Sequence, residues 1–397
     1  MTEHERIDAL RREVASEASV PAREVCVVRS PYRICPLGAH VDHQLGEVTG
    51  MAIDRALLFA FVPREEARVR VRSHNFPGAI ELSLDDVPSR PARDWGDYLR
   101  GAAFALSRRS RLRRGLTGIV DGCDNVGGLS SSAAVGVAYL LALEKANELE
   151  LAPQDNIELD RIIENEFIGL NNGLLDQSTI LLSRQGRLMH LDCQSGRSAL
   201  YDCGSAATIW TVVLYSGLRR QLSDTDYNRR VAECEEAARL LLEAARMEAA
   251  GRPKLRHVPR EVYEQFAPAL PDALQRRAAH FFGEQRRVRE GVGLWQAGNL
   301  AAFGRLISES GRSSVDNYEC GNKYLRTACA VLRETPGVLG ARFSGAGFRG
   351  CCIGLMAQPP AEELARDVLS RYVARHRDME GQAEVHFCRT ADGAGFV

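Results

Sequence analysis

Residues 30–43 read SPYRICPLGAHVDH and place an arginine, a Pro/Gly turn, two histidines and an aspartate between two apolar segments. The preceding residues 25–28 are rich in β-branched side chains, and residues 48–58 are again apolar after a turn centred on Gly46. This pattern predicts a strand, a turn and a second strand. The polar side chains at the turn allow two interpretations. They form either a solvated hairpin in which His40 and Asp42 cap backbone amides, or a corner that binds a polyol through Asp42 and an anion through Arg33.

The composition is that of a globular protein. The chain has 397 residues, 45% of them hydrophobic and 26% charged, and its length favours two domains over one. A formal net charge of −1 gives no electrostatic reason to expect nucleic acid or a membrane surface as a partner. The N-terminus lacks the apolar core of a signal peptide, and no apolar run approaches the roughly 18 residues of a membrane span. We therefore expect a cytoplasmic protein, and nothing in the sequence points to a particular oligomeric state. The 11 cysteines include no CxxC pair, so we expect them to be mostly buried, reduced side chains.

Several further elements follow from local patterns. Residues 2–18 predict a helix, and the alternation of arginine and valine over 68–72 predicts an edge or surface strand with its arginines in water. Asp94 is expected to cap a helix that starts near residue 97, and helices are expected over 260–310. Residues 337–356 predict two strands joined by a glycine-rich turn, and its glycines suggest a close approach to another backbone segment or to a ligand.

A glycine-serine loop, GGLSSSAA at residues 127–134, opens a long apolar helix. Backbone N–H groups at such a helix start, together with the helix dipole, favour an anion such as phosphate, and the serine hydroxyls are available to Mg²⁺. No lysine follows the loop, which excludes the GxxxxGK[ST] phosphate loop. A flexible linker or an ordinary helix cap is the alternative interpretation.

Two acidic side chains follow this loop in the sequence. A helix that Asp155 or Asn156 could cap carries Glu164 on a different face from its apolar stripe, and it is expected to end at Gly169. The loop 171–173 then leads to Asp176. A carboxylate on a helix and another at a loop end, downstream of a phosphate cradle, are suited to holding Mg²⁺ and a sugar hydroxyl. A purely structural aspartate is the alternative.

Taken together, the ordered motifs resemble the galactokinase branch of the GHMP small-molecule kinases, in its galacturonokinase form. The resemblance is carried by residues 30–43, by GGLSSSAA, by ENEFIGLNNGLLDQ at 164–177, by DYNRRVAECEEA at 226–237 and by GARFSGAGFRGCC at 340–352. It implies an α+β fold of two GHMP kinase domains, residues 1–206 and 207–397, with the active site in the cleft between them. It also implies a sugar 1-kinase that uses ATP and Mg²⁺.

The resemblance further implies roles for individual residues. Asp176 and Arg33 match the catalytic pair, the aspartate facing the anomeric hydroxyl and the arginine lying beside the transferred phosphoryl group. Glu164 and, among the serines of the loop, Ser132 match the Mg²⁺ ligands. The substrate-binding positions are Tyr32, Ala39, His40, Asp42, Gly173 and Tyr227. The ATP-binding positions are Trp95, Gly127, Gly128, Leu129, Ser130, Ser131, Ser132, Ala133, Gly345 and Gly347.

The departures from the family pattern concern the substrate. Ala39 stands where galactokinases have the glutamate that accepts a hydrogen bond from the C6 hydroxyl, and Tyr32 stands where they have glycine. Two carboxylates about 3 Å apart repel by roughly 5 kcal/mol at an effective dielectric constant near 20, so loss of this glutamate favours a sugar with a carboxylate at C6. The sequences at Glu319 and Phe348 also resemble the galacturonokinase form. A sugar with a methyl group or nothing at C6 is the alternative.

The resemblance thus predicts D-galacturonic acid as the substrate, with galactokinase and L-arabinokinase as enzymatic alternatives and a sugar and ATP sensor without turnover as the non-enzymatic one. The intact Arg33, Glu164 and Asp176 argue against the sensor. Candidates for binding the C6 carboxylate are Tyr32, Arg219, Arg220 and Lys323. Asp124 and Val126 replace the proline and glycine expected before the serine loop and put its entry geometry in question.

Overall fold

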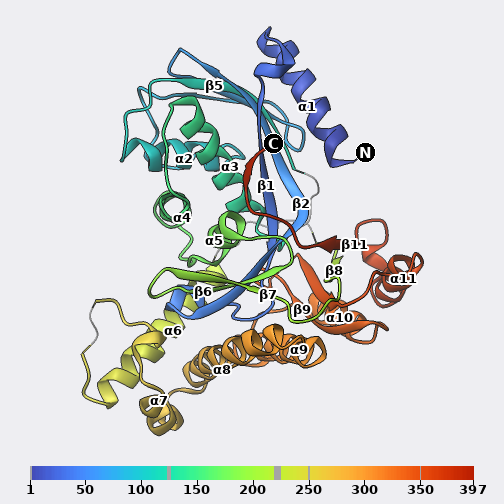
Figure 1. Ribbon diagram of the computed structural model, residues 1–397. Coiled ribbons are helices and arrows are strands. Elements are labelled where there is room, and N and C mark those ends of the chain that lie inside the picture. The colour runs from blue at the N-terminus through green and yellow to red at the C-terminus, as the bar shows by residue number, and fades with distance from the viewer. Residues whose placement is uncertain (1, 123–126, 219–224, 249–250, 349) are drawn as a thin grey trace.

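A computed structural model describes residues 2–122, 127–218, 225–248, 251–348 and 350–397. Within these ranges the strands form two sheets (Figure 1). The first sheet has the order β12-β1-β2-β5-β3-β4, and β6 and β7 continue it from the other end of β2. The second sheet has the order β11-β8-β10-β9.

The strands of the first sheet are β1 (Cys26–Ile34), β2 (Glu47–Arg64), β3 (Arg68–Ser73), β4 (Ala79–Ser83), β5 (Gly115–Asp121), β6 (Arg187–Asp192), β7 (Arg197–Asp202) and β12 (Gly395–Phe396). Those of the second are β8 (Trp210–Tyr215), β9 (Val338–Phe343), β10 (Cys351–Met356) and β11 (Glu384–Arg389). The α-helices are α1 (Glu3–Ala18), α2 (Asp97–Ser107), α3 (Ser131–Ala146), α4 (Pro153–Ile162), α5 (Leu175–Leu182), α6 (Thr225–Ala244), α7 (Arg260–Phe266), α8 (Asp272–Gln296), α9 (Leu300–Asp316), α10 (Lys323–Arg333) and α11 (Leu364–Arg375).

Helices cover both faces of the first sheet. The helix α1 packs on one face through Leu10 and Val14, both 1% exposed, while α2, α3 and α5 lie on the opposite side (Figure 1). The predicted strand, turn and second strand around residues 30–43 are confirmed as β1 and β2, which pair antiparallel. Long apolar runs are required here because helices on both faces leave few positions of the central strands in water.

The strand β3 corrects one prediction. Its Val69 and Val71 are buried and its Arg68 and Arg70 are exposed, as the alternation predicts. It is not an edge strand, however, because it lies between β5 and β4, and β4 forms the edge. The local alternation of side chains indicates which face of a strand is exposed to solvent. Whether the strand lies at the edge of the sheet depends on its pairing with residues far along the chain.

Two predicted helix caps are also wrong. The helix α2 starts after Gly96, and Asp94 instead accepts hydrogen bonds from the Gly96 N–H and from Arg100. In α4 the N-cap residue is Ala152, and Asp155 lies inside the first turn, where its side chain accepts from the Ala152 N–H. In both cases the acidic side chain binds a neighbouring backbone N–H, but the helix begins at a different residue.

The helices α9, α10 and α11 pack on the second sheet, whereas α8 contacts β2, β6 and β7 of the first. The predicted helices over 260–310 are confirmed as α7, α8 and α9, and the strand pair over 337–356 is confirmed as β9 and β10. The helix α9 lies directly on β9, because Gly304 and Gly340 let the two backbones approach closely. In Figure 1 α8 and α9 lie below β7 and β9.

The predicted boundary at residue 206 falls in the connection between β7 and β8, and therefore between the two sheets. The end of the chain returns to the first sheet, where β12 pairs with β1 and Thr390 forms a bridge with Ile53. The division into domains of 1–206 and 207–397 stays a prediction.

Among the described residues, no helix is long and apolar enough to cross a membrane. The described cysteines are free thiols, and most are buried, as expected.

Candidate active site

The predicted catalytic pair lies at the junction of β1, α3 and α5. Arg33 Nε donates to Asp176 Oδ1 at 2.6 Å, and Arg33 Nη1 donates to the Gly128 carbonyl at 3.3 Å. Ser130 Oγ donates to the other carboxylate oxygen of Asp176. Arg33 is only 4% exposed; burial opposes its charge, but the Asp176 carboxylate outweighs burial and raises the Arg33 pKa. A guanidinium that stays charged therefore lies beside a carboxylate and a helix N-terminus.

The glycine-serine loop forms the N-terminus of α3. Gly128 and Ser130 adopt left-handed backbone conformations, with φ of +94° and +62°. Ser130 makes no capping bond to the helix N–H groups, because its hydroxyl turns to Asp176. Leu129 and Ala133 are fully buried and anchor the loop, whereas Ser131 and Ser132 stay at least partly exposed. The first N–H groups of α3 thus have no side-chain cap, which leaves them suited to an anion.

The glycine-rich turn between β9 and β10 packs against this loop. A Cβ on Gly345 would lie 2.9 Å from the Gly128 Cα, and a Cβ on Gly350 would lie 2.5 Å from the Gly127 carbonyl oxygen. A Cβ on Gly347 would meet the Phe343 ring at 2.4 Å. The predicted close backbone approach is confirmed: the turn closes on the loop of α3, and side chains at positions 345 and 350 would push the two apart.

Glu164 lies in a π-helical turn, Ile163–Ile168, that follows α4. It is 1% exposed, and Tyr98 Oη donates to its Oε1 at 3.2 Å. Asp160, one helical turn earlier, is fully buried, and neither of its carboxylate oxygens has a hydrogen-bond partner among the described residues. Burial and then the charges of Glu164 and Asp176 raise the Asp160 pKa well above its usual value. Asp160 therefore ionises less readily than an ordinary aspartate.

Carboxylate and hydroxyl oxygens are the ligands that Mg²⁺ prefers, and kinases hold it with one or two carboxylates and the phosphates of the substrate. Glu164 and the serines of the loop provide this kind of donor set. Within the described part of the chain, no group of three or more His, Cys, Asp or Glu side chains could hold a metal without such a substrate.

Asp42 is the carboxylate predicted to bind a polyol, and that role stays a prediction. It lies in a short 3₁₀ turn, Asp42–Gln44, and accepts from the Gly173 N–H at 3.2 Å. A Cβ on Gly173 would lie 2.7 Å from the Asp42 Cβ, so the contact requires glycine. Burial and then the Asp176 charge raise the Asp42 pKa to about 6. Burial and the carboxylates of Asp42 and Asp176 also raise the Tyr227 pKa, which brings Tyr227 into the same group.

His40 is held by a residue that the sequence did not single out. Its ring stacks on Tyr318, with ring centroids 4.4 Å apart, and its Nε2 lies 3.6 Å from Cys320 Sγ. Burial and then His280 lower the His40 pKa well below its usual value, so the ring is neutral at pH 7. The sequence signal that could have found Tyr318 is its position beside Glu319, where the chain departs from the galactokinase pattern.

Ala39 is held from the other half of the molecule. Its carbonyl accepts from His280 Nε2 at 2.9 Å, and the N–H of the preceding Gly38 donates to Glu284 Oε2 at 2.6 Å. Both partners lie on α8. Ala39 is 6% exposed, and Gly38 has a φ of +88° and a Cβ would lie 2.6 Å from Val48 Cα. The backbone of residues 38–39 is therefore fixed, and the size of the side chain at position 39 decides how much space remains beside it.

Several predicted substrate contacts lie elsewhere. Tyr32 is 1% exposed within the core of the first sheet, on the side of Gly122. Lys323 is exposed at the start of α10, with its ammonium 4.8 Å from the Tyr324 ring. Neither is placed with Asp42 and His40, which speaks against both as carboxylate ligands. Arg219, Arg220, Asp124 and Val126 lie outside the described residues.

Trp95 lies apart from the catalytic pair, before α2. Its ring stacks on Phe76, with centroids 6.1 Å apart, and its Nε1 donates to the Pro77 carbonyl at 3.3 Å. Phe76 is 50% exposed. An aromatic pair at the surface can stack with a planar base, and the adenine role of Trp95 stays a prediction.

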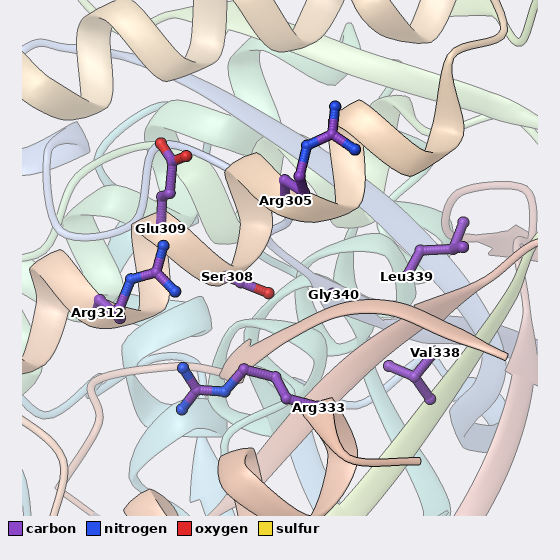
Figure 2. A pocket seen from close by; sticks show the side chains of 8 residues that line it. All are labelled: Arg305, Ser308, Glu309, Arg312, Arg333, Val338, Leu339 and Gly340. Carbon is purple, nitrogen blue, oxygen red and sulfur yellow. The ribbon is translucent and has the colours of Figure 1, made fainter. Parts of the chain in front are cut away.

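Two surface cavities do not involve any of these residues. One of about 330 Å³ lies between α9 and β9 and is lined by Arg305, Ser308, Glu309, Arg312, Arg333, Val338, Leu339 and Gly340 (Figure 2). The other, of about 410 Å³, lies near the end of the chain and includes Arg29, Asp54 and Arg389. The predicted site is instead the buried group of side chains around Arg33, Asp42 and Asp176.

Comparisons with known proteins agree with this geometry. The model of the GHMP kinases N terminal domain matches residues 97–184, and that of the GHMP kinases C terminal matches residues 292–374. The chain is 42% identical to a galacturonokinase of Arabidopsis thaliana, over 98% of this chain and 97% of that protein. It is 31% identical to a galactokinase of Roseiflexus sp. (strain RS-1), over 94% and 93% of the two chains.

Solved structures give the same fold. The crystal structure of Lactococcus lactis galactokinase complexed with galactose superposes with a TM-score of 0.88 at 28% identity and covers 98% of both chains. A mevalonate kinase superposes with a TM-score of 0.63 at 15% identity, over 92% of this chain and 99% of that one. The full-length identity, both family models and the arrangement of Arg33, Asp176 and the α3 loop lead to one conclusion: this chain belongs to the GHMP kinase family and is a sugar kinase of the group that contains galactokinase and galacturonokinase.

Proposed function

We propose that the protein transfers the γ-phosphoryl group of ATP to the anomeric hydroxyl of D-galacturonic acid. The observation that carries this proposal is the junction at which Arg33, Asp176 and the N-terminus of α3 meet beside Asp42, the carboxylate expected to accept sugar hydroxyls. This junction places the proposed sugar site directly beside the proposed phosphate site.

Asp176 positions the attacking hydroxyl. In the structure, its Oδ2 accepts a hydrogen bond from the Ser130 hydroxyl, which marks the place where a sugar hydroxyl would bind. Phosphoryl transfer proceeds through a loose transition state, so the protein acts mainly by alignment and by neutralising charge. Asp176 accepts the hydroxyl proton as the bond to phosphorus forms, and Arg33, held by the same carboxylate, faces the transferred group.

The phosphates of ATP fit the loop of α3. The uncapped N–H groups after Ser130 and the outward hydroxyls of Ser131 and Ser132 supply donors there, and the turn with Gly345 and Gly347 covers the loop. Mg²⁺, held by Glu164 and Ser132, would neutralise charge on the transferred phosphates. Trp95 is assigned to the adenine. A cytoplasmic location stays a prediction.

Ala39 supports an acidic sugar. A glutamate at this position would place its carboxylate against a C6 carboxylate, and alanine removes that repulsion of roughly 5 kcal/mol at about 3 Å. The identity of 42% to a galacturonokinase supports the same substrate, and the galactokinase relatives keep galactose as the second candidate.

The proposal is tested by measuring ADP release with galacturonate, glucuronate, galactose, fucose and arabinose. We expect galacturonate to give the highest kcat/KM. Preference for galactose or arabinose would contradict the substrate, and binding of sugar and ATP without ADP release would identify a sensor instead of an enzyme.

A further inference from the structure

The hydrogen bonds behind the sugar corner fix the proton of one histidine. The Leu255 N–H donates to Gln44 Oε1 at 3.1 Å, which sets the orientation of the buried Gln44 amide. Gln44 Nε2 then faces His43 Nδ1 at 2.9 Å. An amide NH₂ can only donate, so His43 Nδ1 is the acceptor. The neutral His43 ring must therefore carry its proton on Nε2.

This proton determines what Tyr318 can do. His43 Nε2 lies 2.9 Å from Tyr318 Oη, so the tyrosine oxygen accepts a hydrogen bond from the histidine. Burial and then the Lys254 charge lower the His43 pKa to about 3, so the ring does not gain a second proton near neutral pH. The Tyr318 hydroxyl keeps its own proton to donate, and Tyr318 is fully buried. A buried hydroxyl donor is expected to find an acceptor.

The position of Tyr318 indicates which acceptor this is. Its ring stacks on His40, and it lies 5.2 Å between centroids from His280, whose Nε2 holds the Ala39 carbonyl. Tyr318 thus contacts His40 directly and is linked to Ala39 through His280. These are the residues assigned to the sugar, and position 39 is the one that faces C6 in the proposed function.

The neighbouring cations have other partners. Lys254 Nζ donates to the His43 carbonyl at 2.9 Å and to Glu235 Oε1 at 2.7 Å. The buried Arg342 donates to Ser310 Oγ and Ser314 Oγ and to the Phe343 carbonyl. Both add positive potential to this region, and these hydrogen bonds of their side chains are made to other groups of the protein. A substrate carboxylate can only accept hydrogen bonds. The Tyr318 hydroxyl can donate one, because its oxygen already accepts the bond from His43.

We infer that Tyr318 is a specificity-determining residue that donates a hydrogen bond to the C6 carboxylate of the sugar. His43 is the positioning residue: it donates to the Tyr318 oxygen and so leaves the Tyr318 proton for the substrate. The inference rests on the proposed function. A C6 hydroxyl can itself donate and would gain less from this arrangement, because a hydrogen bond to a charged acceptor is about twice as strong as a neutral one.

The test compares Tyr318→Phe and His43→Phe with the unaltered protein, using KM and kcat for galacturonate and for galactose. Tyr318→Phe is expected to raise the KM for galacturonate by about 10- to 100-fold with less than a fivefold change in kcat, and to raise the galactose KM by less than fivefold. His43→Phe keeps the Tyr318 hydroxyl but removes the hydrogen bond that its oxygen accepts from His43. This variant is expected to raise the galacturonate KM by about 3- to 10-fold.

Tyr372→Phe is the matched control. Tyr372 is also fully buried and donates to the Ser216 carbonyl at 2.9 Å, on α11 and away from the sugar corner, so its loss should leave both KM values unchanged. If Tyr318→Phe raises both KM values equally, or neither, the inference is wrong while the proposed function stands. If the unaltered protein neither binds nor phosphorylates galacturonate, both fail. Should Tyr318→Phe not fold, His43→Phe decides, and an unchanged galacturonate KM in that variant overturns the inference.

Discussion

The substitution Ala39→Glu is the sharpest test of why this site accepts an acid. Ala39 is 6% exposed, and its backbone is held by His280 and by the bond from Gly38 to Glu284, so a new side chain must extend into the space beside it. Two carboxylates about 3 Å apart repel by about 5 kcal/mol at an effective dielectric constant of 20. At 1.36 kcal/mol for each factor of ten, kcat/KM for galacturonate should fall by about 10³- to 10⁴-fold.

The same change should help a neutral sugar. A glutamate at position 39 can accept a hydrogen bond from a C6 hydroxyl, and a bond to a charged group contributes about 1.5–3 kcal/mol, so galactose use should improve by roughly 10- to 100-fold. Both values are obtained from initial rates of ADP release, with thermal unfolding of each variant to confirm that it is folded.

Ala39→Gln is the matched control, because glutamine has the size of glutamate without the charge. It should lower galacturonate use by less than about tenfold. If glutamine and glutamate lower it equally, size and not charge excludes the acid, and the electrostatic explanation is refuted.

Four further predictions follow from the site and its surroundings. Asp176→Asn should lower kcat by more than about 10³-fold while sugar affinity by calorimetry stays within a factor of ten; an active variant would remove Asp176 from catalysis. Because Asp42 must be ionised to accept sugar hydroxyls and its pKa is about 6, kcat/KM should fall about tenfold per pH unit below pH 6, and a flat profile down to pH 5 would contradict this. Gly345→Ala introduces a Cβ at φ +70°, 2.9 Å from the Gly128 Cα, and should raise the KM for ATP at least tenfold with little effect on sugar affinity; an unchanged KM would show that the turn does not shape the phosphate site. Burial raises the pKa of Glu144, 5% exposed, to about 7, so the folded state loses stability as pH rises from about 4.5 through 7. Glu144→Gln removes that loss and should raise the free energy of unfolding by about 3 kcal/mol at pH 8.5 but by little at pH 4.5; equal effects at both pH values, measured by urea denaturation, would be inconsistent with a buried ionisable group.

Local sequence patterns were sufficient for the parts of the site built from neighbouring residues. The strands around residues 30–43 and the helix after Ser130 follow from periodicity and turn residues, and the glycines of 345–350 indicate a close backbone approach. The identity of the approached segment does not follow from them, since the turn meets Gly127 and Gly128 only once the two sheets are in place.

The support behind the sugar corner could not be predicted locally. Tyr318 is separated from His43 by 275 residues, and their contact depends on how α8 and α9 pack beside the first sheet. The edge position of β4 and the start of α2 after Gly96 likewise depend on distant pairing or on competing hydrogen bonds. For Tyr32 the motif itself misled the prediction. Its position in the motif suggested a substrate contact, but its side chain lies in the core.

A competition between two sugars in one vessel decides whether the protein is a 1-kinase for galacturonic acid. Equal concentrations of galacturonate and galactose are supplied with ATP and Mg²⁺, and the phosphorylated products are quantified by ³¹P and ¹H NMR at low conversion, where their ratio equals the ratio of the two kcat/KM values. We predict that galacturonic acid 1-phosphate exceeds galactose 1-phosphate by at least about tenfold. An excess of galactose 1-phosphate, or phosphate at a position other than the anomeric oxygen, would contradict the claim.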